Sequence, residues 1–108
     1  MPLNNAQLSN LTTSFQDLYA VPSGVASVSV TSIICSNKAV TATDLTMTLT
    51  NSSNTILIYL SFTITVPVGA SFSPIPSPIF LKPGQKLRVL ASAINALDIS
   101  LSCVEFLL

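Results

Sequence analysis

The sequence predicts an all-β protein: an antiparallel β-sandwich of about eight strands in jelly-roll-like order, with an extended N-terminal arm. Three observations lead to this prediction. Apolar and polar residues alternate strictly in the middle of the chain, no segment has helical periodicity of useful length, and turn residues separate short strands throughout. About eight strands in 108 residues make one domain. A long strand arm and a proline-rich segment suggest strands that change sheets, as in a jelly roll.

The clearest element is a central hairpin. Its first arm, residues 45–50, has apolar residues at odd positions, and its second arm, residues 56–66, has them at even positions. Residues 51–54 are turn formers. With these four as the loop, the expected cross-strand pairs are Leu49 with Ile56, Met47 with Ile58 and Leu45 with Leu60. Thr46, Thr48 and Thr50 then form a solvated outer row.

Residues 1–13 are expected to form an extended arm, and residues 14–108 the sandwich domain. The arm is polar and has only Leu3, Leu8 and Leu11 as scattered apolar anchors. Two interpretations remain open, a disordered tail and a tether that lies on a neighbouring subunit.

The next strands are expected at residues 14–20 and 25–35. Val28 and Val30 share one face, after which the parity breaks. A bulge near Thr31 would return Ile33 and Cys35 to the core side.

Pro74, Pro76 and Pro78 occupy alternate positions between residues 71 and 80. Because proline lacks an N–H donor, this segment is expected to be an edge strand or an extended connection.

The end of the chain reads as a second hairpin, residues 86–92 with residues 98–107. Its expected pairs are Ala91 with Ile99, Val89 with Leu101 and Leu87 with Cys103.

The composition is unusual in its charge. Hydrophobic residues make up 49% of the chain, charged residues only 7%, and the net charge is zero; about 25% charged residues is typical. Either the surface is a neutral one rich in threonine, or the chain is a subunit packed among other proteins. Some apolar residues lie where the sandwich core does not need them. With the arm they are the candidate contacts with copies of itself or with a larger shell: Leu3, Leu8, Leu11, Leu57, Tyr59, Leu90, Val104 and Phe106.

Catalysis is not indicated by the sequence. There is no histidine, which removes the usual general base and the commonest metal ligand. Only four carboxylates are present, and the three glycines are too far apart for a phosphate loop. We therefore expect no enzyme activity, no metal and no cofactor.

Nucleic acid and membrane partners are not expected either. Four cations without a cluster do not suit a phosphate backbone, and no run reaches the ~18 apolar residues of a spanning helix. Residues 1–6 lack a basic region and an apolar core, so no signal peptide is expected. Cys35 and Cys103 have inward parity; two buried free thiols are favoured over an inter-sheet disulfide.

Three stretches carry a resemblance to a known family: residues 17–24 (DLYAVPSG), 34–37 (ICSN) and 81–87 (LKPGQKL), with Glu105 near the end of the last strand. In this order they resemble small β-sandwich structural proteins of tailed bacteriophages. The resemblance implies a virion component assembled in the host cytoplasm, namely a head decoration (cement) protein on the major capsid protein. A neck, tail or fibre accessory protein is the alternative. The resemblance also implies a homotrimer.

Two other classes fit less well. A lectin-like module would usually show exposed tryptophan, and this chain has none. A cupin-type enzyme would need the histidines that are missing.

Overall fold

The computed structural model describes residues 3–74 and 78–108, and every element in this part of the chain is a strand. In chain order the strands are β1 (Leu3–Leu8), β2 (Gln16–Ala20), β3 (Val25–Asn37), β4 (Thr43–Thr50), β5 (Ile56–Val66), β6 (Ser71–Phe72), β7 (Ile79–Leu81), β8 (Lys86–Ala91) and β9 (Leu97–Leu107).

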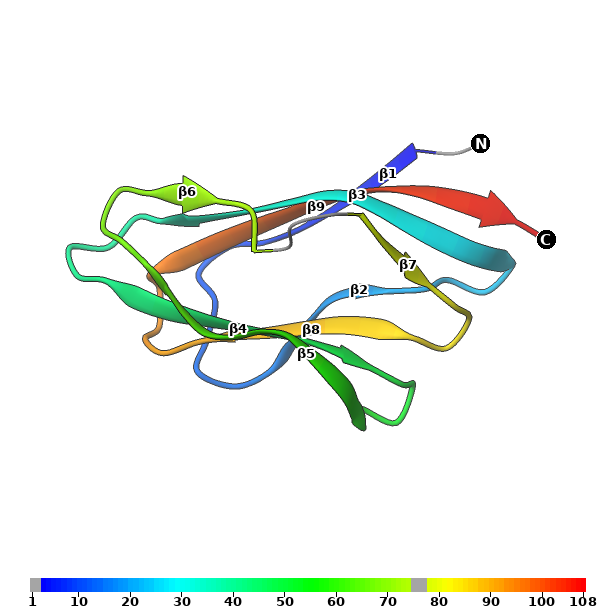
Figure 1. The fold of residues 1–108 in the computed structure, drawn as a ribbon, viewed down its shortest axis with the longest axis horizontal. Coiled ribbons are helices and arrows are strands. Elements are labelled where there is room, and N and C mark those ends of the chain that lie inside the picture. Colours follow the sequence, from blue (N-terminus) through cyan, green and yellow to red (C-terminus); the bar gives the residue numbers. More distant parts are fainter. Residues whose placement is uncertain (1–2, 75–77) are drawn as a thin grey trace.

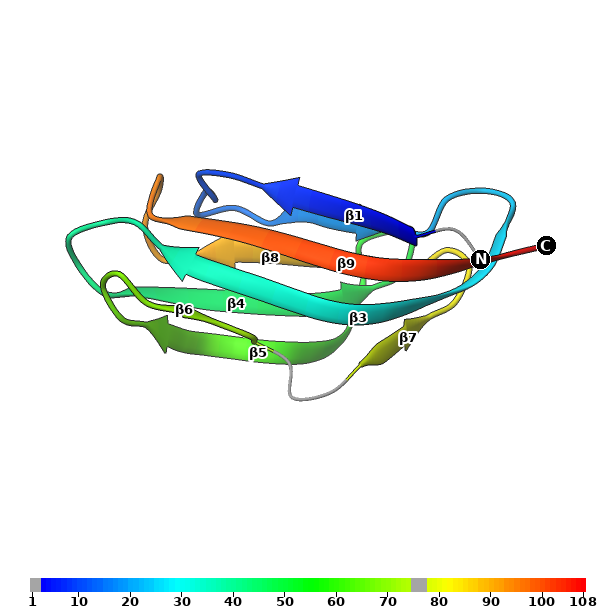
Figure 2. The same cartoon turned by 90° about the horizontal axis from the view of Figure 1, so that it is seen from above.

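The strands form two antiparallel sheets that face each other across one core (Figure 1). The five-stranded sheet has the order β1-β9-β3-β6, with β7 also on β3, and the four-stranded sheet has the order β2-β8-β4-β5. Viewed from above, the first sheet lies over the second, and β5 runs along the outer edge of the lower layer (Figure 2). If β6 and β7 count as two pieces of one strand, this is the order of an eight-stranded jelly roll. The predicted fold class is therefore confirmed.

The prediction that residues 86–92 and 98–107 form a hairpin is wrong. β8 pairs with β4 and β2, whereas β9 pairs with β3 and β1, so the two strands belong to different sheets. Their inward residues face one another across the core. Period-two alternation shows which face of a strand is buried, but a strand next to it and a strand opposite it satisfy that pattern equally well.

The central hairpin forms in the four-stranded sheet, but its register differs from the expected one. Leu49 pairs with Ile58, Met47 with Ser61 and Leu45 with Ile64. The cause is local: the turn is longer, because the Asn51 side chain accepts hydrogen bonds from the backbone N–H groups of Ser53 and Thr55. Irregularities along β5 then absorb further residues.

The bulge predicted in β3 is confirmed. The pairing of β3 with β9 shifts between Val30 and Ser32, and Val30, Ile33 and Cys35 are all fully buried. The extra residue, Thr31, lies outside, where its Oγ1 donates a hydrogen bond to the Ser102 carbonyl (3.1 Å).

The two described ends of the proline-rich segment lie at a sheet edge, one of the two expected arrangements. β6 pairs with residues 35–36 of β3, and β7 with residues 28–30. Pro76 lies outside the described residues. Pro74 is buried, and its carbonyl accepts a hydrogen bond from the Ser61 hydroxyl of β5 (2.8 Å), which links the two sheets.

The N-terminal segment differs from the expected arm. Residues 3–8 form β1, which pairs along its whole length with β9. Leu11 is fully buried in the core of its own chain, and its backbone bonds to Leu97 and Asn95. It was expected to be a contact with another subunit, and that expectation is wrong, because the crossing from one sheet to the other closes the end of the core with this side chain.

Candidate assembly surface

The expected contact residues do not form one surface. Leu3, Val104 and Phe106 lie on the outer face of the five-stranded sheet, where Leu3 pairs with Val104. Leu57, Tyr59 and Leu90 belong to the other sheet. Leu8 is partly buried and packs against the core, and Leu11 is part of the core itself. The two expected aromatic anchors, Tyr59 and Phe106, are therefore on opposite layers.

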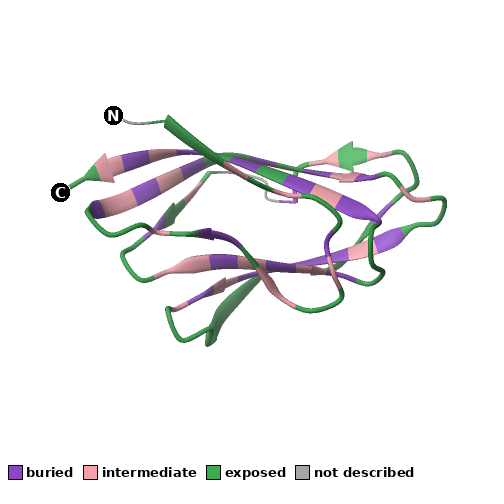
Figure 3. Cartoon of the chain, turned by 180° about the vertical axis from the view of Figure 1, so that it is seen from behind, coloured by how far each residue is buried: buried purple, intermediate pink, exposed green. Residues whose placement is uncertain are grey.

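β5 is the most exposed strand of the sandwich. Eight of its eleven residues are exposed, and in Figure 3 it lacks the alternating stripes of the central strands. Three residues hold it to the core: the partly buried Leu60, the buried Ser61 and the fully buried Val66. Its first half slants away from the five-stranded sheet (Figure 1), and residues 56–59 are all exposed.

The exposed side chains of β5 are large and apolar. Leu57 and Tyr59 were expected outside, and they are 51% and 47% exposed. Four more apolar side chains are exposed that the sequence pattern did not predict outside: Ile56, Ile58, Phe62 and Ile64. Their even positions predicted burial, but β5 is an edge strand that slants away from the other sheet (Figure 1), so these side chains stay exposed. Tyr59 and Phe62 contact each other edge to face, with ring centroids 5.0 Å apart.

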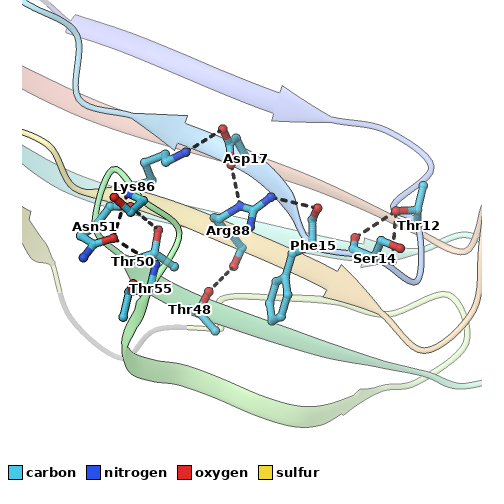
Figure 4. A network of polar contacts seen from close by, with 11 residues as sticks. Thr12, Ser14, Phe15, Asp17, Thr48, Thr50, Asn51, Thr55, Lys86 and Arg88 are labelled. Carbon is cyan, nitrogen blue, oxygen red and sulfur yellow. Dashed lines mark hydrogen bonds and ion pairs between the residues drawn. The ribbon is translucent and has the colours of Figure 1, made fainter.

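Charged side chains of β2 and β8 on the same sheet are paired within the chain (Figure 4). The Arg88 guanidinium donates to Asp17 at 2.7 Å and to the Phe15 carbonyl at 3.2 Å, and it lies 5.9 Å from the centre of the Phe15 ring. Lys86 adds a second ion pair to Asp17 at 3.5 Å. The β2 and β8 side of the sheet is thus satisfied within the chain.

The threonine row of β4 is buried, contrary to the expected solvated row. The Thr48 hydroxyl donates to the Arg88 carbonyl, visible in Figure 4. Thr46 Oγ1 accepts from the Thr63 backbone N–H at 3.1 Å, because β5 bends over it there. The neighbouring strands cover these hydroxyls and also supply their hydrogen-bond partners, so burial costs little.

A second apolar region lies at one end of the sandwich. Val40, Val68 and Ile94 are exposed on three loops. Backbone bonds from Asn37 to Ala70 and from Lys38 to Ala96 bring these loops together. Loop residues have no periodic pattern, so the sequence offered no signal for this region.

Glu105 carries the most buried of the four carboxylates. It accepts hydrogen bonds from the Tyr19 hydroxyl (2.5 Å) and the Asn4 amide (3.1 Å). The Tyr19 bond, and then the Asn4 bond, lower the pKa of Glu105. Burial, and then the Glu105 carboxylate, raise the pKa of Tyr19 far above its ordinary value. The pair therefore stays as carboxylate and phenol, which suits a structural link better than proton transfer.

The thiols are buried and free, as expected. Burial, and then the negative charge of Asp98, raise the pKa of Cys35 to about 11; burial also raises the pKa of Cys103. Neither forms a thiolate nucleophile at neutral pH. A surface hollow of about 250 Å³ lies between Asn4, Thr31 and Cys103. It contains no pair of groups with the chemistry of an acid and a base.

Within residues 3–74 and 78–108, no three metal-ligating side chains come together. The same part of the chain contains no helix long and apolar enough to span a membrane.

The fold has known counterparts among solved structures. The chain is similar to the subunit of Bacillus endospore appendages, which form disulfide-linked pili, at a TM-score of 0.60 and 12% identity; 99% of this chain and 88% of that chain are covered. It is also similar to the protein of the T13 infectious bursal disease virus particle, at a TM-score of 0.57 and 14% identity. A third similar structure is the VP2 protein of the same virus in T=1 particles, at a TM-score of 0.53 and 14% identity.

The chain spans about a third of these two viral proteins, 31% and 32% of their length, although 98% of this chain is covered. No family model and no curated protein matches the sequence. At this level of identity the likeness concerns the fold.

Proposed function

We propose that this chain is a non-catalytic structural subunit of a virion, which works by burying its apolar surface against copies of itself and against a larger shell. The observation that carries the proposal is the exposed apolar strand β5 on a protein with almost no free charge. Large exposed apolar patches on soluble proteins mark contact surfaces.

The polar chemistry of the chain supports a structural role. Asp17 is paired with Arg88 and Lys86, Asp98 with Lys38, and Glu105 with Tyr19 and Asn4. The fourth carboxylate, Asp44, accepts from the Thr65 hydroxyl. All four carboxylates are thus engaged in holding strands together.

The finer assignment is a decoration protein on the major capsid protein of a phage head, located in the virion and assembled in the host cytoplasm. It rests on the bacteriophage resemblance of residues 17–24, 34–37 and 81–87. The likeness to the fold of viral particle proteins agrees with it. The resemblance also implies three copies.

A second candidate is a subunit of an extracellular filament. One observation favours it: the pilus subunit is matched over 88% of its length, as a whole subunit, whereas the viral proteins are matched over a third. Either assembly would use the exposed apolar surface.

Sedimentation of the purified protein over a range of concentrations tests the shared part of the proposal. We expect a defined oligomer that forms reversibly. Immunogold labelling of particles from cultures that produce the protein then separates the alternatives, because label on closed shells supports the virion and label along filaments supports the second candidate. A chain that stays monomeric at high concentration and labels neither structure would contradict the proposal.

A further inference from the structure

We infer that β5 is the contact strand of this protein, and that it pairs antiparallel with β5 of a second copy to join two four-stranded sheets into one of eight strands. The inference rests on the proposed function and names the site and the partner within it.

The edges of the two sheets differ in how well they are protected against pairing. Edge strands usually carry devices against pairing, such as short length, charge or proline. β1 has six residues with Asn4, Asn5 and Gln7; β2 has five residues with Asp17. β6 and β7 have two and three residues in the proline-rich segment. β5 has eleven residues without a charge or a proline. It is thus the least protected of these edges.

One edge of β5 is free to pair with another strand. Its pairing partner in the sheet is β4, and no strand of the described residues lies on its other edge. An edge of this kind offers a row of backbone donors and acceptors to another strand. The left-handed Thr63 (φ 48°) bends the strand near its middle, so we place the contact on residues 56–62.

A second copy of β5 is the partner that best fits this edge. The exposed row is apolar on both sides of the strand, and it includes the Tyr59 and Phe62 pair. The open edges β1 and β2 present amides and an ion-paired carboxylate, so within this chain β5 itself is the best apolar match. With four cations and four anions in the whole chain, two copies approach without net repulsion.

The area is sufficient for such a contact. Five large apolar side chains of residues 56–62 are between 37% and 62% exposed. At roughly 150–250 Å² for a side chain of aromatic size, they present on the order of 500 Å² per copy. Two copies would bury on the order of 1,000 Å², near the lower limit of a specific interface, before any backbone surface is counted.

The pairing has a consequence for stoichiometry. An antiparallel contact of a strand with itself is two-fold, so each residue of one copy meets its partner reciprocally. It therefore gives a dimer or an even number of copies, in place of the trimer that the resemblance implies.

The test compares the full-length wild type with two single variants, Leu57→Lys and Tyr59→Lys. A third single variant, Ile34→Lys, is the matched control. Ile34 is 53% exposed, against 51% for Leu57, but lies on the outer face of the five-stranded sheet. We expect a dimer for the wild type. Each β5 substitution should raise the dissociation constant of the dimer by about 30-fold or more, as for a central interface residue. The control substitution should change this constant little. Circular dichroism verifies that each variant keeps its strands.

Hydrogen exchange of the wild type gives a readout that needs no variant. Amides of residues 56–62 should exchange more slowly above the association concentration than below it. A dimer or trimer that tolerates both β5 lysines, or that Ile34→Lys dissociates, overturns the strand pairing but leaves the structural subunit in place. Aggregates without a defined size also overturn it. A strictly monomeric chain removes both proposals.

Discussion

The Tyr19 hydroxyl and the Glu105 carboxylate form a hydrogen bond across the core. Tyr19 belongs to β2 in the four-stranded sheet and Glu105 to β9 in the five-stranded sheet. Both residues are buried, and no ion pair of the described residues includes Glu105. A hydrogen bond to a charged group contributes about 1.5–3 kcal/mol, and the cost of leaving such a charge unpaired is larger. This link therefore helps to hold the two layers together.

Tyr19→Phe should lower the free energy of unfolding at neutral pH by about 1.5–3 kcal/mol, because it leaves the buried carboxylate with the Asn4 amide as its remaining donor. Tyr59→Phe is the control, since Tyr59 is exposed; its effect should stay within about 0.5 kcal/mol. Urea denaturation at low protein concentration measures both. Equal effects would mean that the Tyr19 bond contributes nothing specific.

The same carboxylate predicts a pH dependence of stability. The pKa of Glu105 is lower in the folded chain than its ordinary value of 4.5. Its contribution is therefore complete above the unfolded pKa and is lost as the pH falls through the folded pKa. We expect the wild type to lose stability from about pH 5 downward, and Glu105→Gln to flatten this loss.

Asp98 supplies a control for that experiment. Burial alone would raise its pKa, but the Asn10 backbone N–H and Lys38 lower it overall. Asp98→Asn should remove a separate part of the acid loss, so the double variant should be flatter than either single one. A Glu105→Gln variant with the full wild-type slope would contradict the assignment to Glu105.

At the scale of the element, the N-terminal segment is part of the sandwich. β1 pairs with β9 through six residues, and Leu11 fills the core between the sheets. Removal of this segment would therefore expose both a sheet edge and the core.

Leu11→Ala should destabilise the chain by about 2–5 kcal/mol, because the site is closed and would leave a cavity. Leu3→Ala, at a side chain that is 82% exposed, should have little effect. Thermal unfolding of both variants measures the difference. A Leu11→Ala variant as stable as Leu3→Ala would show that the segment is a dispensable arm.

The alternation of residues predicted much of the fold, because parity records which face of a strand is buried. It was enough to locate the bulge at Thr31 from Val30 and Ile33. Parity does not record which strand lies beside another. The sequence prediction therefore paired β8 with β9 in one sheet, although they lie in different sheets.

The candidate surface was predictable only in part. Leu57 and Tyr59 were found because they break a polar row. Ile56 and Ile58 were missed, because their inward parity does not reveal that β5 is an edge strand whose first half slants away from the other sheet (Figure 1). Leu11 was misplaced for the opposite reason: an isolated leucine in a polar segment has no period that indicates a core.

At the scale of the whole molecule, the scarcity of charge should determine how the protein associates. The ion pairs of Asp17 and Asp98 lie within one chain, and β5 has no charged residue to offer a partner. Burial of apolar area is then the main source of binding free energy, and it is enhanced by salts that are excluded from protein surfaces.

We therefore expect the self-association constant to change by less than about threefold between 0.1 and 0.5 M sodium chloride, since screening acts on charges that the contact does not use. Sulfate at equal ionic strength should strengthen the association, because apolar burial becomes more favourable. Sedimentation in the two salts measures both effects, and Ile34→Lys, which adds a charge away from β5, should behave as the wild type does. A tenfold weakening in sodium chloride would mean that ion pairs hold the copies together, and the apolar strand would then not be the contact.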